Sequence, residues 1–354
     1  MVTTTMKAAV LHAPGDLRVE NVPIPVAGPD EVLVRVMAAG ICGSDIGRVM
    51  VTGTYNFPTI PGHEFSGVIE RIGSNVNNLA PGDRVAVAPL MPCMECEWCD
   101  AGKFSLCDSY DFMGSRRNGA FAEYIAAPAR NVINIPDHVT YEVAATIEPA
   151  AIILHGIHKL NLSLGDAVAV VGCGALGYFA LQFAKLSGAQ PLIAIDVDDE
   201  KLALARKVGA DLCINPTKVD ALEAVKAATR GLGVQISLEC AGSNAGRDLS
   251  ILVTAKQGSV MLYGTAYGDV LFSEKAFARM VREELQVIGS WNSYSLPFPG
   301  KEWIDIIQLL QNGRLLIEPL ISHRASLDEA PAIFKSLKTR SFGPYHKILF
   351  KPNG

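Results

Sequence analysis

Apolar and polar positions alternate over short stretches in the first 150 residues, a pattern typical of half-buried strands. Four such stretches are residues 7–11, 31–36, 67–72 and 84–87. They are separated by turn sequences such as Pro14-Gly15 and Pro81-Gly82-Asp83. The pattern predicts a barrel-like or irregular β-rich domain, which we assign to residues 1–152.

Beyond Pro149 the periodicity changes, and short apolar strands alternate with helices. Helices are predicted at residues 150–160, 176–187, 200–208, 222–228 and 244–254. Strands are predicted at residues 166–171, 192–196, 212–214, 234–239, 259–263 and 284–289. Such alternation indicates a parallel, doubly wound sheet, assigned to residues 153–292. Residues 293–354 leave the alternation, with a helix at 303–310 and a strand at 346–350, and we expect them to return to the first domain.

Length and composition fit a globular protein with two domains. The 354 residues carry a net charge of −5, without the basic character that nucleic-acid binding needs. Met1 to Lys7 lacks the apolar core of a secretory signal, and no apolar run reaches the ~18 residues of a membrane span. We therefore expect a cytoplasmic protein, in which the eight cysteines are thiols or metal ligands.

A glycine-rich segment follows the predicted strand 166–171 and opens the next helix. Its members are Gly172, Gly174, Ala175, Leu176 and Gly177. Here glycine allows a tight turn and the close approach of a pyrophosphate to the helix N-terminus. Asp196, nineteen residues after Gly177, is expected to bind ribose hydroxyls and repel a 2′-phosphate, so NAD is predicted over NADP. The alternatives are a plain strand-to-helix turn and, for Asp196, a helix N-cap.

Four cysteines, Cys93, Cys96, Cys99 and Cys107, fall within fifteen residues. Four thiolates suit tetrahedral zinc, and a closed thiolate shell leaves no position for substrate. We predict a structural zinc that orders the loop 93–107, which has little apolar core of its own. The alternative is a mobile loop with four unpaired cysteines.

Candidates for a second, catalytic zinc are dispersed along the chain. Cys42, His63, Glu64 and Glu148 offer sulfur, nitrogen and oxygen, the mixed set of zinc sites that keep one position for water or substrate. Each residue alone is equally compatible with a packed core position. Spacing does not show that the four side chains meet.

The motif Gly62-His63-Glu64, the four-cysteine loop and the glycine-rich segment together resemble the zinc-dependent medium-chain alcohol and polyol dehydrogenase superfamily, over essentially the whole chain. Within it, residues 110–124 and 287–294 are most similar to the galactitol-1-phosphate 5-dehydrogenases. The resemblance implies an α/β protein with a GroES-like catalytic domain, a Rossmann NAD-binding domain, two zinc ions per chain, and a homodimer or homotetramer.

The resemblance also implies roles for single residues. Cys42, His63 and Glu148 match the catalytic zinc ligands, Glu64 replaces Glu148 in some states, and Ser44 matches the hydroxyl that takes the substrate proton. Many alcohol dehydrogenases carry a histidine three residues after this hydroxyl, where this chain has Gly47. We therefore do not expect a long proton relay that ends in histidine.

The activity expected from this resemblance is oxidation of a secondary hydroxyl of a polyol phosphate, similar to galactitol 1-phosphate, to the ketose phosphate. Zinc acidifies the bound hydroxyl, and the resulting alkoxide transfers hydride to NAD. The alternatives are a dehydrogenase of a free alditol such as galactitol or sorbitol and, from another class, a non-catalytic NAD-binding or structural protein. A zinc-free quinone reductase of the superfamily would have no use for Cys42, His63 or the four-cysteine loop.

Four further residues are candidates for substrate contacts. Arg116 and Arg117 are able to clamp a phosphate, or else form a solvated or ion-paired turn. Tyr55 either touches substrate or is loop surface, and Trp291 either lines the pocket or packs against its neighbours.

Overall fold

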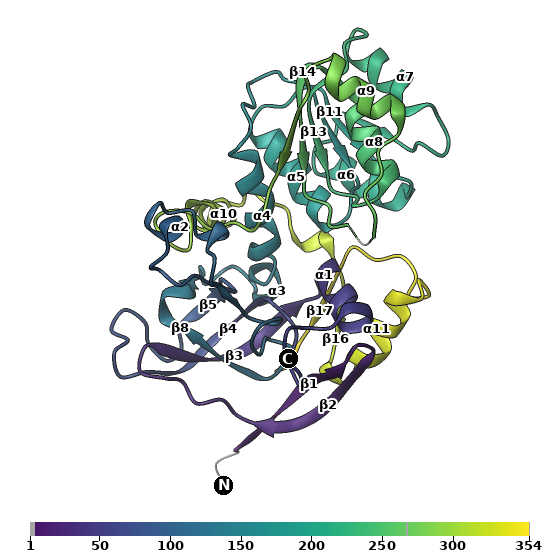
Figure 1. Ribbon diagram of the computed structural model, residues 1–354. Coiled ribbons are helices and arrows are strands. Elements are labelled where there is room, and N and C mark those ends of the chain that lie inside the picture. Colours follow the sequence, from purple (N-terminus) through teal and green to yellow (C-terminus); the bar gives the residue numbers. More distant parts are fainter. Residues whose placement is uncertain (1–3, 267, 354) are drawn as a thin grey trace. The chain divides into compact units, whose positions relative to one another are not determined.

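The fold is described from a computed structural model, for residues 4–266 and 268–353. The chain folds into two compact units (Figure 1). Unit 1 comprises Met1–Glu148 and Tyr294–Gly354, and unit 2 comprises Pro149–Ser293. No helix in the described part of the chain has the length and apolar character needed to cross a bilayer.

Unit 2 is built on a six-stranded sheet in the order β12-β11-β10-β13-β14-β15, and all neighbouring strands are parallel. The strands are β10 (Val168–Val171), β11 (Leu192–Ile195), β12 (Leu212–Ile214), β13 (Val234–Glu239), β14 (Thr254–Leu262) and β15 (Gln286–Gly289). The helices are α5 (Ala175–Leu186), α6 (Asp199–Lys207), α7 (Ala221–Ala228), α8 (Asn244–Val253) and α9 (Glu274–Arg282), and Figure 1 shows them beside the sheet. This strand order is that of the Rossmann fold, which confirms the predicted doubly wound sheet.

Local sequence explains these elements. Strands β10 and β11 are apolar and buried at every position, as a parallel sheet covered on both faces requires. Asp198, Asp220 and Ser243 each accept backbone hydrogen bonds at the start of α6, α7 and α8. Helix α9 was not predicted; it alternates apolar and charged residues, and only Ala276 is buried.

Unit 1 is mainly a mixed β structure, as predicted. Its main sheet follows the path β16-β17-β3-β4-β5-β9, with β8 also paired to β3, and two-stranded pairs join β1 to β2 and β6 to β7. The strands are β1 (Thr5–Ala13), β2 (Asp16–Pro23), β3 (Glu31–Gly40), β4 (Glu64–Ile72), β5 (Arg84–Val87), β6 (Leu90–Met91), β7 (Asp111–Phe112), β8 (Tyr124–Pro128), β9 (Val132–Asn134), β16 (Ile321–Ala325) and β17 (Lys347–Phe350). The helices are α1 (Gly43–Gly47), α2 (Glu97–Asp100), α3 (Tyr141–Ala144), α10 (Lys301–Gln311) and α11 (Ala330–Lys338), and α4 (Ile147–Ile157) contains the sequence boundary between the units.

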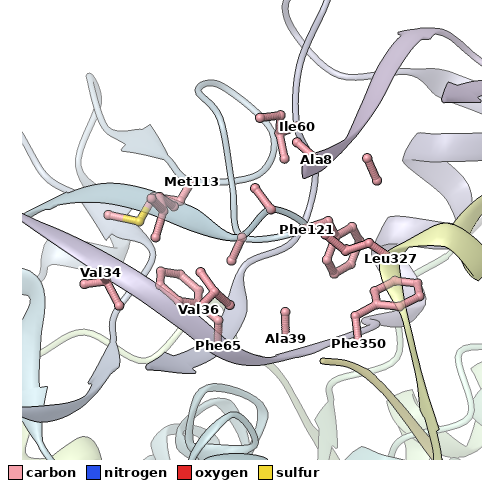
Figure 2. Close-up of a cluster of buried hydrophobic side chains, with 14 of the residues drawn as sticks. Ala8, Val34, Val36, Ala39, Ile60, Phe65, Met113, Phe121, Leu327 and Phe350 are labelled. Atoms are coloured by element: carbon pink, nitrogen blue, oxygen red, sulfur yellow. The ribbon is translucent and has the colours of Figure 1, made fainter. Parts of the chain in front are cut away.

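The C-terminal residues complete the main sheet of unit 1. Strand β17 pairs antiparallel with β3, with Leu349 opposite Gly40 and Phe350 opposite Ala39. In Figure 1 the yellow β17 lies beside the purple β3. This pairing brings Phe350 into a cluster of buried aromatic side chains. The centroid of the Phe121 ring lies 5.0 Å from that of Phe350 and 5.9 Å from that of Phe334. Figure 2 shows Phe121 and Phe350 close to Leu327 in this core.

The ring of Phe121 also explains the glycine of the Gly-His-Glu motif. Gly62 has φ = 97°, and a Cβ at this position would overlap the Phe121 ring. A side chain is therefore excluded both by backbone conformation and by space. The position of His63 depends on this close packing.

We predict that Phe121→Ala lowers the free energy of unfolding of unit 1 by about 3–5 kcal/mol, because the fully buried ring leaves a cavity. Urea unfolding followed by near-ultraviolet circular dichroism measures the change. Val26→Ala is the control, since Val26 is 87% exposed and its truncation should change stability by less than about 0.5 kcal/mol. A similar, small effect of both substitutions would contradict the packing role of Phe121.

Candidate metal and cofactor sites

Cys42, His63 and Glu64 converge at one end of the paired strands β3 and β4. Cys42 follows β3 and immediately precedes α1, His63 immediately precedes β4, and Glu64 is the first residue of β4. Gly40 lies opposite Glu64 in the antiparallel register, so the three side chains approach from two adjacent strand ends. One ligand atom of each residue lies within 4.8 Å of the other two.

Asp45 orients the imidazole of His63. Asp45 is fully buried, its Oδ1 lies 3.2 Å from His63 Nδ1, and its Oδ2 accepts a hydrogen bond from the Cys42 backbone N–H at 3.0 Å. Burial alone would lower the pKa of His63, but the charge of Asp45 and its hydrogen bond outweigh this effect and raise the pKa. With Nδ1 facing a carboxylate, Nε2 is the nitrogen left for a metal, as in many zinc-binding histidines. Sequence reasoning missed Asp45, although its place in the first turn after Cys42 is a signal for a capping carboxylate.

A second group that the sequence did not reveal is Lys347, in β17. Lys347 is 3% exposed, and its Nζ forms an ion pair with Glu64 Oε2 and donates to the Ile41 carbonyl at 3.0 Å. Burial alone would lower the pKa of Lys347, but the charge of Glu64 reverses the shift and raises it. Gly40 makes room for this pair, because a Cβ there would overlap Glu64 Oε2. Lys347 therefore places a buried positive charge beside the Glu64 carboxylate.

Glu148 lies beside this group and outside the 4.8 Å cluster. It occupies the second position of α4, is 3% exposed, and its Oε2 has no hydrogen-bond partner among the described residues. Burial raises the pKa of Glu148 to about 7, with the charge of His63 opposing the shift and that of Glu64 adding to it. The buried carboxylates of Glu64 and Glu148 thus lie close enough for their charges to repel each other.

These residues fit a zinc ion. Glu64 Oε1 and Glu148 Oε2 are buried without hydrogen-bond partners among the described residues, a costly arrangement that a cation relieves. Thiolate, imidazole and carboxylate form a donor set used by catalytic zinc. Cys42, His63 and Glu64 would hold the ion, with Glu148 as the adjacent carboxylate.

The four cysteines of residues 93–107 form a separate cluster. Cys96 immediately precedes α2 and Cys99 lies within it, and the four sulfur atoms are within 4.8 Å of one another. Cys93 Sγ lies 3.4 Å from Cys107 Sγ and 3.9 Å from Cys99 Sγ. Sulfur atoms around a tetrahedral zinc are about 3.8 Å apart, as follows from a Zn–S distance of about 2.3 Å. The spacing fits a structural zinc.

In unit 2 the glycine-rich segment forms the turn between β10 and α5. Gly172 has φ = 92°, and a Cβ at Gly177 would overlap the Gly172 carbonyl oxygen. A Cβ at Gly174 would meet no atom within 4 Å, so the backbone before α5 is open to a ligand. This cradle fits a dinucleotide, held by Gly172, Gly174 and Gly177 and by the first residues of α5, Ala175 and Leu176.

Asp196 follows β11, next to this turn. Its Oδ2 accepts from the Cys173 N–H at 2.6 Å, and its Oδ1 accepts from the Asp198 N–H at 2.9 Å. Asp198, not Asp196, is the N-cap of α6. Asp196 therefore binds the glycine turn itself, with further lone pairs left for a ribose hydroxyl.

The candidate substrate residues differ from one another in their surroundings. The Arg116 guanidinium stacks between two rings, 4.1 Å from the centroid of Tyr55 and 4.6 Å from that of Tyr110. Arg117 is instead ion-paired with Glu31 at 3.5 Å, which agrees with the alternative of an ion-paired turn. Trp291, in unit 2, is 53% exposed.

We predict that Cys42→Ser and Cys99→Ser each remove one of two zinc ions, with different consequences. Cys42→Ser should lower turnover at least about 100-fold with the fold retained, because the lost ligand is catalytic. Cys99→Ser should lower the melting temperature, because its zinc orders a loop. Metal analysis and thermal unfolding measure both effects. The control Cys213→Ser, outside both clusters, should keep two zinc ions, and the assignment would be wrong if either cluster variant also kept both.

Comparisons with known proteins agree with this geometry. Residues 28–137 match the family model "Alcohol dehydrogenase GroES-like domain", and residues 175–312 match "Zinc-binding dehydrogenase". The galactitol 1-phosphate 5-dehydrogenase of Escherichia coli (strain K12) is 40% identical over 325 residues, 91% of this chain and 94% of that protein. The sorbitol dehydrogenase of Bacillus subtilis (strain 168) is 38% identical over 336 residues, 93% of this chain and 92% of that protein. The crystal structure of galactitol-1-phosphate dehydrogenase from Escherichia coli has a TM-score of 0.91 at 38% identity, covering 98% of this chain and 100% of that chain. This chain therefore belongs to the zinc-dependent medium-chain alcohol and polyol dehydrogenases.

Proposed function

We propose that this zinc-containing, NAD-dependent alcohol or polyol dehydrogenase acts on a polyol phosphate. Its substrate would be of the galactitol 1-phosphate type, with a secondary hydroxyl oxidised to the ketone. The similarity to galactitol 1-phosphate 5-dehydrogenase over 91% of the chain supports this substrate class. Charge and geometry around Arg116 support it independently.

Arg116 carries the proposal for a phosphate. No carboxylate of a described residue pairs with its guanidinium, and its Nε is buried without a hydrogen-bond acceptor. The backbone N–H of Arg116 donates to the Phe112 carbonyl at 3.0 Å. The centroid of the Phe112 ring lies 5.5 Å from that of the His63 ring. A stacked arginine whose charge no described carboxylate neutralises is suited to bind a phosphate.

The chain's own residues have separable tasks in the reaction. Zinc, when bound, supplies a Lewis acid for the substrate hydroxyl, and NAD accepts the hydride. Cys42, His63 and Glu64 hold the metal site, and Asp45 fixes the orientation of His63. Ser44 Oγ takes the proton of the substrate hydroxyl. The glycine turn and Asp196 bind the pyrophosphate and the ribose in unit 2.

A free alditol is the second candidate substrate. The 38% identity to the Bacillus subtilis sorbitol dehydrogenase favours it, since this similarity is almost as high as the 40% identity to galactitol 1-phosphate 5-dehydrogenase. A free alditol would leave Arg116 without an anionic partner. The two candidates therefore differ in what they require of this one side chain.

We predict that galactitol 1-phosphate is oxidised with NAD at a higher kcat/KM than galactitol or sorbitol, and that NADP is a poorer oxidant. Arg116→Gln should lower kcat/KM for the phosphate about 10- to 100-fold, the effect of one or two lost charge-assisted hydrogen bonds. It should change turnover of free alditols little. The control is Arg117→Gln, whose guanidinium is already paired with Glu31. Equal losses on phosphorylated and free substrates would refute phosphate binding by Arg116.

We also propose that the protein is a homo-oligomer assembled through unit 2. Strand β15 is an edge strand with exposed residues, including Val287 at 40%. On α9, Phe277 and Val281 lie one turn apart and are 60% and 64% exposed. An unpaired strand edge and an exposed apolar helix face are features that a second copy covers.

The double substitution Phe277→Glu with Val281→Glu is expected to reduce the mass in solution to that of a monomer, because it places charges on the proposed contact. Size-exclusion chromatography with light scattering measures the mass. Leu164→Glu serves as the control, since Leu164 is 89% exposed and lies outside α9. An unmodified protein that is already monomeric would overturn the proposal.

A further inference from the structure

The Ser44 hydroxyl is held from one side by Arg48. Arg48 Nη1 donates to Ser44 Oγ at 2.9 Å. Ser44 belongs to α1, and Arg48 opens the π-helical turn Arg48–Thr52 that continues it. Residues four positions apart lie on one face of such a helix, so the contact follows from the local fold.

The same guanidinium faces the carboxylate that orients His63. Arg48 Nη1 lies 3.8 Å from Asp45 Oδ1, the oxygen that is 3.2 Å from His63 Nδ1. The Arg48 side chain is 26% exposed, whereas Asp45 is fully buried. Arg48 therefore has two partners, the Ser44 hydroxyl and the Asp45 carboxylate, and both restrain its guanidinium.

We propose that Arg48 is a positioning residue for Ser44, which determines how this hydroxyl carries the substrate proton. A serine hydroxyl has one hydrogen and two lone pairs, and Arg48 occupies one lone pair. The free lone pair accepts the proton of the substrate hydroxyl. The original Ser44 hydrogen passes to a water molecule in the same step, so one O–H bond forms on Oγ as another breaks.

Neither Arg48 nor Gly47 offers another route for this proton. Arginine has five N–H donors and no acceptor, so Arg48 cannot receive the hydrogen that Ser44 releases. Gly47 has no side chain at all. The fixed charge of Arg48 stabilises the negative charge that grows on Oγ as the Ser44 hydrogen leaves, a preorganised electrostatic effect. Arg48 thus acts through Ser44 and does not itself carry the proton.

A double-mutant cycle tests this inference, with Arg48→Gln, Ser44→Ala and the combination. The cycle uses whichever polyol the unmodified enzyme oxidises, so it rests on alcohol oxidation and is independent of phosphate recognition. Arg48→Gln should lower kcat about 10-fold with KM changed less than about 2-fold, the loss of one charge-assisted hydrogen bond. In the Ser44→Ala background the same substitution should have no further effect, because its target is gone. Arg48→Lys should restore part of kcat.

Two further measurements separate positioning from structural damage. Zinc content and the affinity for NAD, followed by fluorescence titration, should be unchanged in Arg48→Gln. The control Arg18→Gln removes a guanidinium that pairs with Asp16 at 2.7 Å on the β1–β2 hairpin, and should leave kcat unchanged. Multiplicative losses in the double variant, loss of zinc, or a change confined to KM would each overturn the inference.

Discussion

The register of β3 against its two neighbours determines where the catalytic groups lie. Pairing with β4 places Glu64 opposite Gly40, and pairing with β17 places Leu349 opposite the same glycine. The buried Lys347 thereby meets Glu64 beside the start of α1. A shift of β4 by one residue would turn Glu64 to the other face of the sheet, and the same shift of β17 would turn Lys347 away from Glu64. Backbone hydrogen bonding in this sheet is thus the constraint on which the chemistry depends.

Charge compensation is the second requirement of the cluster. Asp45, Glu64 and Glu148 are buried together with only two basic partners of comparable burial, His63 and Lys347. Buried charges are tolerated when they are paired, and removal of one partner leaves the other at high cost. A divalent cation completes this balance. The same charges that bind the metal therefore make the apo cluster an unfavourable arrangement.

Much of the fold could be predicted, because it depends on local patterns. The limits of β5, β12 and β13 were predicted to the residue, since each is a short apolar run between polar turns. Helices α9 and α11 were not predicted. Helix α9 buries only Ala276, whereas α11 buries Ala330, Ile333, Phe334 and Leu337 at a helical spacing that the prediction overlooked. The metal-ligand candidates follow from residue types with distinctive chemistry. Asp45 has a weak local signal, its place in the first turn after Cys42, whereas Lys347 gains its role only from neighbours that tertiary structure brings together.

The place of β17 in the catalytic sheet has a consequence for biosynthesis. Unit 2 is one continuous stretch of chain, whereas unit 1 needs both the first and the last part. During translation the Rossmann unit is complete before residue 347 leaves the ribosome. Until then Glu64 lacks Lys347 and the Ala39–Gly40 end of β3 lacks β17, so the nascent chain has a finished nucleotide-binding unit and an unfinished metal site. The sheet that carries the metal ligands is therefore the last part of the fold to be completed.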